Sequence, residues 1–461
     1  MTTIPISSAL RLVASAGVLV ATAACTDTLV PNYNNPVLPT TIESPAALQA
    51  QVTGVLAGDR ENHAFQILIM ETMGRDAYRI DAADPRYINN PLGLFNPSAF
   101  VTNFLWNSHY RTIRSANDLV SGVTASGTFS AADKAGARGV ARTLKAHQYM
   151  RLIETRDTIG VPIALGFGGQ DPIRCKPAVL TYISALLDSA ATDLAAAGTS
   201  FAFVLPGGFS TNGTFDTPAG FLQFNRGLKG KNEVYRAFRA YAASATIDAA
   251  ALADAITALD ASFFNVGSPF RNGVYHKYST SSGDLTNGNF DQSVHRVNPK
   301  VAAEAEAGDL RLSKIVKDPS KFLTTETVAS DYLFTILSGP TTPLPLLINE
   351  ELILVRAEAL WGQNNDAGAL ALINAVRTTS GGLPARVIGS FATRLDILRE
   401  ILKQKRYSLL FESPSRAIDY RMFGLWAELG TERTPAVLGP RVVPLPEAET
   451  NARGGSSACT P

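Results

Sequence analysis

The chain has 461 residues, of which 46% are hydrophobic and 18% are charged, and its formal net charge is +1. This composition argues against disorder and predicts one large helical unit or two to three average domains. The charge balance shows no basic stripe and no acidic block, so it gives no sign of a nucleic-acid partner.

The first 24 residues have the form of an export signal. They hold one charged residue, Arg11, and then the apolar run LVASAGVLVATAA, which ends in small residues before Cys25. Thirteen residues are too few to cross a bilayer, but they suit a secretory signal. We interpret residues 1–24 as a lipoprotein signal peptide with Cys25 as the acylated first residue, although Thr22 stands where leucine is usual. A signal cut near an Ala-x-Ala site is the alternative.

Two further features follow from the cysteines and the residues after Cys25. Residues 25–41 are rich in Pro and Asn and predict an extended tether that leads to a body at 42–461. Cys175 and Cys459 could form a disulfide in an exported protein, but unpaired thiols are the interpretation that the sequence favours. Their spacing does not suggest a metal site.

Amphipathic segments in the body predict about ten helices in roughly five pairs. Three irregular excursions interrupt them, near residues 79–101, 198–230 and 265–299. After the second excursion, we expect the helical pattern to resume at Lys231. Because long loops in a compact protein are usually functional or disordered, the aromatic excursions at 79–101 and 265–299 are the places to seek a binding site.

Two groups of residues on the early helices are expected to be structural. Trp106 and Tyr110 share a helical stripe with Ile113, which favours a place in the core over a ligand platform. His147 shares a face with apolar residues, and a lone histidine in that setting predicts a hydrogen-bonded core residue and no metal site.

The stretch 347–421 has the clearest helical pattern. LLINEELILVRAEALW predicts a helix that closes at Gly362, and a second helix is expected to begin with Asp366 as its N-cap. The resulting pair is close to the ~34 residues of a tetratricopeptide unit. A third helix is expected at 394–411.

Two carboxylates, Glu351 and Glu358, fall on that mostly apolar first helix. A buried carboxylate needs a partner, and the expected partners are Arg377, Arg416 or Arg421. Glu412 and Asp419 join the same neighbourhood, so the charged residues of this block form a predicted buried brace.

Several motifs, and the order in which they occur along the chain, resemble those of the SusD/RagB family of outer-membrane nutrient-uptake lipoproteins. They are the EELILVRAEALWGQ..DAGALALINAVR hairpin, the FES.SRAIDYR run, the closing VVPLPEAETNARG, and the earlier W…Y..I…N, Gly-x-Pro and Asp-x-Arg patterns. The sequence departs from the family where Gln404, Lys405, Ser408 and Leu409 replace the usual Glu-Arg and Glu-Leu. We expect this departure to remove part of the buried ion network.

The resemblance implies an all-α fold, a SusD-like helical body with tetratricopeptide-like pairs and long loop excursions. It also implies a lipid-anchored, cell-surface subunit of the outer membrane that captures an oligomeric nutrient, most often a glycan, for a SusC-like TonB-dependent transporter. No catalysis, cofactor, metal or nucleic acid is implied. The candidate ligand-binding residues lie in two of the loops and offer aromatic faces and polar groups: Arg86, Tyr87, Asn89, Asn90, Phe95, Tyr275, His276, Tyr278 and Phe290.

Two other functions are compatible with a chain of many helix pairs. A helical-barrel hydrolase would need two carboxylates about 5 to 9.5 Å apart facing a cleft. Glu351 and Glu358 are two turns apart on one helix, ~10.5 Å along its axis, and the apolar residues around them predict a packed surrounding and no cleft. A tetratricopeptide-like scaffold for proteins or peptides is the remaining alternative, and it differs from the first function in its ligand.

Overall fold

The computed structural model describes residues 41–164, 171–431 and 439–461. The predicted signal peptide, Cys25 and nearly all of the tether lie outside the described residues. Thr41–Pro461 forms one compact unit.

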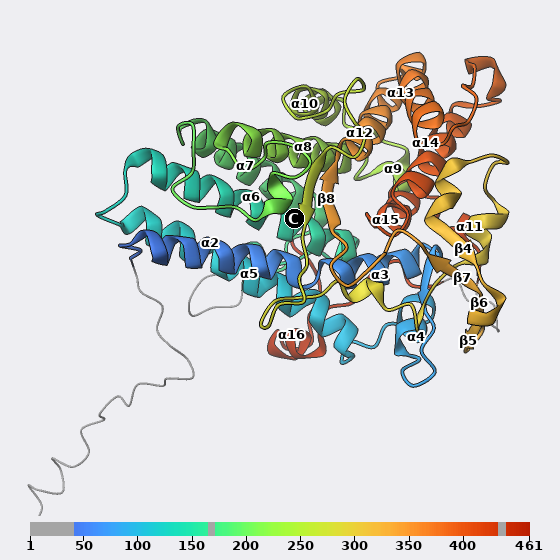
Figure 1. The fold of residues 1–461 in the computed structure, drawn as a ribbon, viewed down its shortest axis with the longest axis horizontal. Coiled ribbons are helices and arrows are strands. Elements are labelled where there is room, and N and C mark those ends of the chain that lie inside the picture. The colour runs from blue at the N-terminus through green and yellow to red at the C-terminus, as the bar shows by residue number, and fades with distance from the viewer. Residues whose placement is uncertain (1–40, 165–170, 432–438) are drawn as a thin grey trace, which may run out of the picture. The chain divides into compact units, whose positions relative to one another are not determined.

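Helices dominate this unit (Figure 1). The long ones are α2 (Pro45–Glu61), α3 (His63–Met73), α5 (Phe100–Ala125), α6 (Ala131–Arg156), α7 (Lys176–Ala195), α8 (Pro218–Ala237), α10 (Ala249–Asp260), α12 (Asn349–Gly362), α13 (Asp366–Thr379), α14 (Arg394–Ser408) and α15 (Ser415–Met422). The short ones are α4 (Arg86–Leu92), α9 (Tyr241–Ser244), α11 (Pro299–Ala303) and α16 (Glu447–Ala452).

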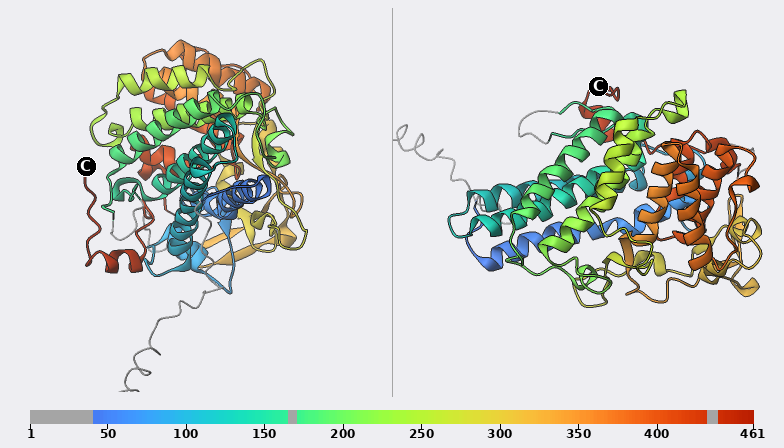
Figure 2. Two further views of the ribbon diagram at one scale, coloured as in Figure 1. Left: turned by 90° about the vertical axis from the view of Figure 1, so that its left-hand side faces the viewer. Right: turned by 90° about the horizontal axis from the view of Figure 1, so that it is seen from above.

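Consecutive helices pack side by side. α5 packs on α6, α6 on α7, α7 on α8 and α8 on α10, and α12 then joins this layer and pairs with α13 and α14. The right-hand view of Figure 2 shows the layer from above, with the orange helices α12, α13 and α14 at one end of it. Because each helix buries its apolar stripe against its neighbours, the arrangement confirms the predicted body of tetratricopeptide-like pairs.

Among the described residues, one helix, α7, is long and apolar enough to cross a membrane by length and composition. It packs between α6 and α8, and its buried residues include Leu180, Ile183 and Leu187. The apolar residues of α7 are therefore explained by its packing against the neighbouring helices.

The predicted boundary at Lys231 is wrong, because α8 already begins at Pro218. Thr217 caps the helix by accepting a hydrogen bond from the Gly220 backbone N–H at 3.2 Å. Glycines within α8 hide the apolar period. A Cβ at Gly227 would lie 2.7 Å from Leu347 of β8, and one at Gly230 would lie 2.6 Å from Leu259 of α10, so small residues are needed where α8 approaches its neighbours closely.

The C-terminal hairpin of α12 and α13 matches the prediction except at its cap. Asn365, and not Asp366, accepts the hydrogen bond from the Gly368 backbone N–H, at 2.9 Å. Asp366 instead pairs with Arg394 at the start of α14. A shift of one residue puts the amide, rather than the carboxylate, at the capping position.

The core residues Trp106 and His147 lie as predicted. Trp106 is 5% exposed, and its ring centroid lies 4.7 Å from that of Tyr110, whose hydroxyl donates to the Pro162 carbonyl. His147 is buried with Nδ1 2.8 Å from Asp59 Oδ1. These side chains of α5 and α6 therefore pack inside the protein.

Short strands form three small antiparallel sheets. A four-stranded sheet has the order β1 (Ala77–Arg79), β3 (His295–Val297), β7 (Tyr332–Phe334) and β4 (Ile315–Lys317). The others pair β2 (Gly273–His276) with β8 (Leu344–Ile348) and β5 (Leu323–Thr325) with β6 (Val328–Ser330). These strands join segments of the first and third excursions, so the excursions are less irregular than predicted; the first also contains α4.

Cys175 and Cys459 form a disulfide, so the interpretation as free thiols is wrong. They are 284 positions apart in sequence, yet their Cα atoms lie 4.9 Å apart. The Cys175 backbone N–H also donates to the Thr460 carbonyl at 2.8 Å. The bond thus fixes the C-terminal segment to the start of α7.

Candidate functional site

The two-stranded antiparallel sheet of β2 and β8 places Tyr275 at the centre of the candidate site. The register of this pair shifts between Val274 and Tyr275, and such a bulge re-aims the side chain beside it. A turn before α8 packs on the same strand so closely that a Cβ on Gly208 would lie 1.9 Å from the Tyr275 carbonyl oxygen. The Tyr275 hydroxyl donates to the Arg271 carbonyl at 2.7 Å.

The loop before β2 is tied to the first turn of α12. Asn349 donates from Nδ2 to the Asn265 carbonyl at 2.7 Å and accepts from the Asn265 backbone N–H at 2.9 Å. The Glu350 backbone N–H donates to the Phe270 carbonyl at 3.0 Å. Arg271 and Glu350 are therefore held on the same wall.

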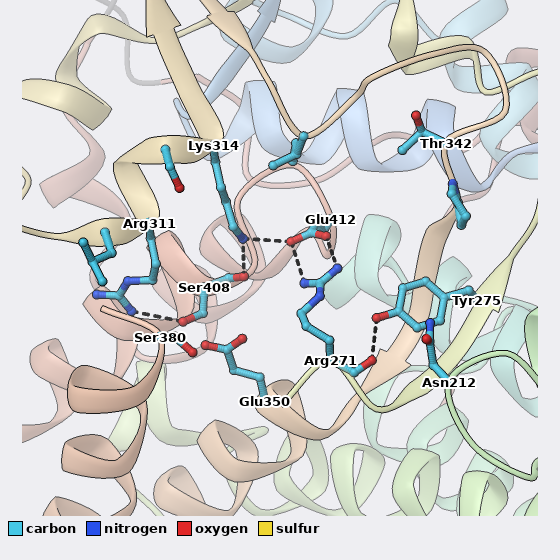
Figure 3. Close-up of a pocket in the computed structure, with 14 residues that line it drawn as sticks. Asn212, Arg271, Tyr275, Arg311, Lys314, Thr342, Glu350, Ser380, Ser408 and Glu412 are labelled. Carbon is cyan, nitrogen blue, oxygen red and sulfur yellow. Dashed lines mark hydrogen bonds and ion pairs between the residues drawn. The ribbon is translucent and has the colours of Figure 1, made fainter. Parts of the chain in front are cut away.

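This wall borders a cavity of about 640 Å³, which Figure 3 shows with its lining side chains. The lining comes from the second and third excursions, the segment 310–314, the loop before β8, the first turn of α12 and the ends of α13 and α14. It mixes aromatic, aliphatic, hydroxyl and charged groups: Asn212, Arg271, Tyr275, Leu310, Arg311, Ser313, Lys314, Ile336, Thr342, Pro343, Glu350, Ser380, Ser408 and Glu412. A cavity of this size and mixture suits a ligand of several sugar units or a peptide of similar size.

Glu412 holds two cations at the cavity wall. Its carboxylate accepts hydrogen bonds from Arg271 Nη1 at 3.0 Å and from Lys314 Nζ at 2.8 Å. Burial alone would raise the pKa of Glu412, but Lys314 and Arg271 outweigh it and lower the pKa to about 2. The residue is thus ionised, and it fixes two flexible cationic side chains in place.

A second cavity of about 330 Å³ lies against the other side of Tyr275. Its lining includes Phe209, Lys277, His276 and the ion pair between Arg60 and Asp284. His276 is 4% exposed, and its Nε2 lies 2.9 Å from Asp59 Oδ2. Burial lowers the pKa of His276, so the neutral ring is favoured at neutral pH.

The candidates from the third excursion are therefore divided. Tyr275 lines both cavities and His276 lines the second. Tyr278 is 7% exposed, packs in the core and has the Arg60 guanidinium 5.8 Å from its ring centroid. Phe290 is half-buried in the short turn before β3.

The candidates from the first excursion line neither of these cavities. Asn90 and Phe95 are each 4% exposed, and Asn90 bonds to the backbone of Arg86 and Asn96. Asn89 donates to Glu326 at 3.2 Å. These contacts are those of ordinary loop packing.

Tyr87, by contrast, belongs to a half-buried aromatic cluster of Phe65, Tyr87, Phe100 and Phe104. Its ring centroid lies 5.3 Å from that of Phe100, and the Arg86 guanidinium lies 4.6 Å from the Phe100 centroid while bonding to Asp84. The cluster offers partly exposed ring faces and lines neither of the two cavities described above, and it is a second place where a sugar ring could stack.

The predicted partners of Glu351 and Glu358 are wrong. Lys231 Nζ lies 3.0 Å from Glu351 Oε1, and Lys405 donates to both Glu358 and Asp419 at 2.8 Å. Lys405, which was expected to weaken the network, is its centre. Both glutamates are buried, and neither lines the cavities, so their geometry does not match that of a glycosidase pair.

The three arginines proposed as those partners bind elsewhere. Arg377 pairs with Glu306 at 2.8 Å, and Arg416 pairs with Asp76 at 2.8 Å. Arg421 donates to the Arg441 carbonyl at 2.8 Å. The expected partners were arginines close to the two glutamates in sequence. Lys231 was missed because it comes from α8, far from them in the chain.

Among the charged residues that line the cavity, the sequence analysis did not single out Arg271, Lys314 and Glu350. Arg271 lies six residues after Asn265, inside the excursion from which aromatic residues were chosen. Glu350 precedes Glu351 in a helix, and a step of about 100° places it on another face. The position of Glu350 around the helix axis could therefore have indicated that it faces other surroundings than Glu351.

The fold resembles that of solved SusD-like proteins. No protein-family model matches the sequence, and no curated protein matches it. A SusD homologue from Bacteroides thetaiotaomicron superposes with a TM-score of 0.66 at 14% identity, over 89% of this chain and 96% of that one. The chain therefore has the SusD-like fold.

Two further structures agree. Bacteroides fragilis NanU matches with a TM-score of 0.64 at 15% identity, over 92% of this chain and 98% of that one. A SusD-like carbohydrate-binding protein from Bacteroides fragilis matches with a TM-score of 0.64 at 15% identity, over 89% of this chain and 98% of that one. The predicted fold class is confirmed across nearly the whole length of these chains.

Proposed function

We propose that this protein is a non-catalytic, lipid-anchored member of the SusD/RagB family that captures an oligosaccharide at the cell surface and delivers it to a SusC-like TonB-dependent transporter. The observation that carries the proposal is the SusD-like fold, since solved proteins of this fold include one named as carbohydrate-binding. The cavity around Tyr275 supports it, because an aromatic ring beside hydroxyl, amide and charged groups is a typical sugar-binding combination.

The ligand is tested by calorimetric titration of the mature chain with oligosaccharide and peptide panels. Binding to at least one oligosaccharide, lost in Tyr275→Ala and kept in Tyr87→Ala, assigns the cavity. The reverse pattern assigns the aromatic cluster of Phe65, Tyr87, Phe100 and Phe104. Binding to peptides alone would replace the proposal with the tetratricopeptide-like scaffold.

The anchor and the transporter are tested separately in the native host. Metabolic labelling with radioactive palmitate is expected to mark the wild-type protein and not Cys25→Ala, and protease treatment of intact cells is expected to degrade it. Affinity purification from outer membranes is expected to recover a TonB-dependent transporter. Unlabelled wild-type protein would contradict the lipid anchor, and protection from protease would contradict the surface location.

A further inference from the structure

Glu350 carries an open hydrogen-bonding position at the wall of the larger cavity. The residue is 3% exposed and lines the cavity, and within the described parts of the chain its Oε1 atom has no hydrogen-bond donor. Leaving a buried charged acceptor unpaired is costly to a fold. In Figure 3 its side chain points toward the other lining residues, so a bound molecule could supply the missing donor.

The cations near Glu350 are occupied by other carboxylates. Arg271 and Lys314 both bind Glu412, and Arg311 binds the buried Asp309 at 2.8 Å. Arg271 is nevertheless close enough to Glu350 for their charges to interact. Glu350 is thus left as an acceptor that the neighbouring cations do not cover.

The charges around the cavity cancel. Its lining contributes three cations, Arg271, Arg311 and Lys314, and two carboxylates, Glu350 and Glu412. Asp309 behind Arg311 adds a third carboxylate, which gives three charges of each sign. A balanced cavity offers little attraction to a ligand with a net charge of its own.

Apolar groups complete the cavity. Leu310 is 63% exposed at its edge, and Ile336, Pro343 and the Tyr275 ring also line it. The apolar faces of sugar rings can pack on such groups while their hydroxyls donate to carboxylates.

From these observations we infer that Glu350 is a specificity-determining residue that accepts a hydrogen bond from a ligand hydroxyl and selects neutral oligosaccharides over acidic ones. The inference rests on the proposed glycan-binding function. A uronic acid placed at the same position would bring a second carboxylate to Glu350, and the described cations that line the cavity are already paired with other carboxylates. Like charges in a desolvated site repel.

The test compares wild type with Glu350→Gln, which keeps the shape and an acceptor oxygen but removes the charge. The matched control is Glu428→Gln, because Glu428 is exposed, lines neither cavity and pairs with Arg399 at the surface. Calorimetry would use neutral glucose or xylose oligosaccharides and galacturonate oligosaccharides of equal length. Thermal unfolding of the ligand-free proteins is measured in parallel.

Wild type is expected to bind the best neutral oligosaccharide at least about tenfold more tightly than the acidic one. Glu350→Gln is expected to shrink that ratio at least about fivefold, whereas Glu428→Gln leaves it unchanged. The melting temperature of Glu350→Gln is expected to stay within about 2 °C of that of wild type, because the substitution removes no hydrogen bond from a described protein donor.

Several results would overturn the inference. A wild-type preference for the acidic oligosaccharide, or an unchanged ratio in Glu350→Gln, rejects the role of Glu350 while leaving glycan binding intact. A large fall in melting temperature, or failure of Glu350→Gln to fold, shows that the carboxylate is structural. If the wild-type protein binds no oligosaccharide, the proposed function itself fails.

Discussion

Glu350 and Glu351 are neighbours in the first turn of α12, yet they lie in different surroundings. Glu351 faces inward, where Lys231 lies 3.0 Å away and Ser413 donates at 3.2 Å. Glu350 lines the cavity and keeps an oxygen without a protein donor in the described structure. One helix thus carries a satisfied structural carboxylate and an open one on adjacent faces.

The inward face of α12 belongs to a lysine-centred network that includes Glu351, Glu358, Asp419, Lys231 and Lys405. Each lysine bridges carboxylates from different helices. Lys405 pairs with Glu358 and Asp419. Lys231, which pairs with Glu351, also lies 3.4 Å from Glu154. The contrast teaches that burial of a carboxylate does not reveal its role. What distinguishes the two glutamates is whether a protein donor completes the hydrogen bonding.

The largest expected effect in this comparison is the loss of Lys405. Lys405→Met leaves Glu358 and Asp419 buried without their shared cation, so the free energy of unfolding is expected to fall by about 3–5 kcal/mol. Urea denaturation at pH 7 measures it. Lys403→Met is the control, because Lys403 is partly exposed and pairs with Glu306; its loss should cost less than about 1 kcal/mol. Equal effects of the two substitutions would show that the network is not a brace.

An intermediate effect is expected for the two neighbouring glutamates. Glu351→Gln weakens contacts with Lys231 and Ser413 and is expected to destabilise the protein by about 1–3 kcal/mol. Glu350→Gln loses no protein donor at Oε1 and is expected to cost less than about 1 kcal/mol, through the helix dipole. If Glu350→Gln were the more destabilising of the two, the comparison would be reversed.

The last difference is in pH dependence, where the change in stability is small for each unit of pH. Burial raises the pKa of Glu358 from 4.5 to about 7, whereas Lys314 and Arg271 overcome burial and lower the pKa of Glu412 to about 2. The native state therefore binds the Glu358 proton more tightly than the unfolded chain, and that stabilising contribution is lost as pH rises from 4.5 to 7. The Glu412 contribution is present above pH 4.5 and is lost as pH falls toward 2.

Denaturation midpoints from pH 2.5 to 8 would separate these contributions. Glu358→Gln is expected to remove a slope of at most about 1.4 kcal/mol per pH unit in the upper window, since a single proton is involved. Glu412→Gln is expected to change the lower window instead. A change in the same window for both variants would contradict the opposite shifts of the two pKa values.

The predictable parts of the fold are those with local periodic patterns. The hairpin of α12 and α13 and the buried stripe of Trp106 followed from spacing along single helices. The start of α8 did not, because glycines that allow close helix packing carry no hydrophobic signal. Strand segments of three to five residues were too short to give a period, so the four-stranded sheet was not expected.

The candidate site was predictable in part for a related reason. Tyr275 could be chosen because it is aromatic and lies in an excursion, and it does line both cavities. Asn90 and Phe95 met a similar criterion, yet they are buried in loop packing. Residue type alone does not tell whether a loop side chain turns toward a cavity or toward the core.

The sequence by itself determined the helical class, the family resemblance and the buried position of the carboxylates on α12, because these depend on periodicity and motif order within short segments. Tertiary structure alone decided that Lys231 and Lys405 hold Glu351 and Glu358, that Cys175 reaches Cys459, and that Glu350 opens onto a cavity. Each of these depends on segments that are far apart in the chain, and hydrogen-bond partners and cavities exist only once such segments have packed together.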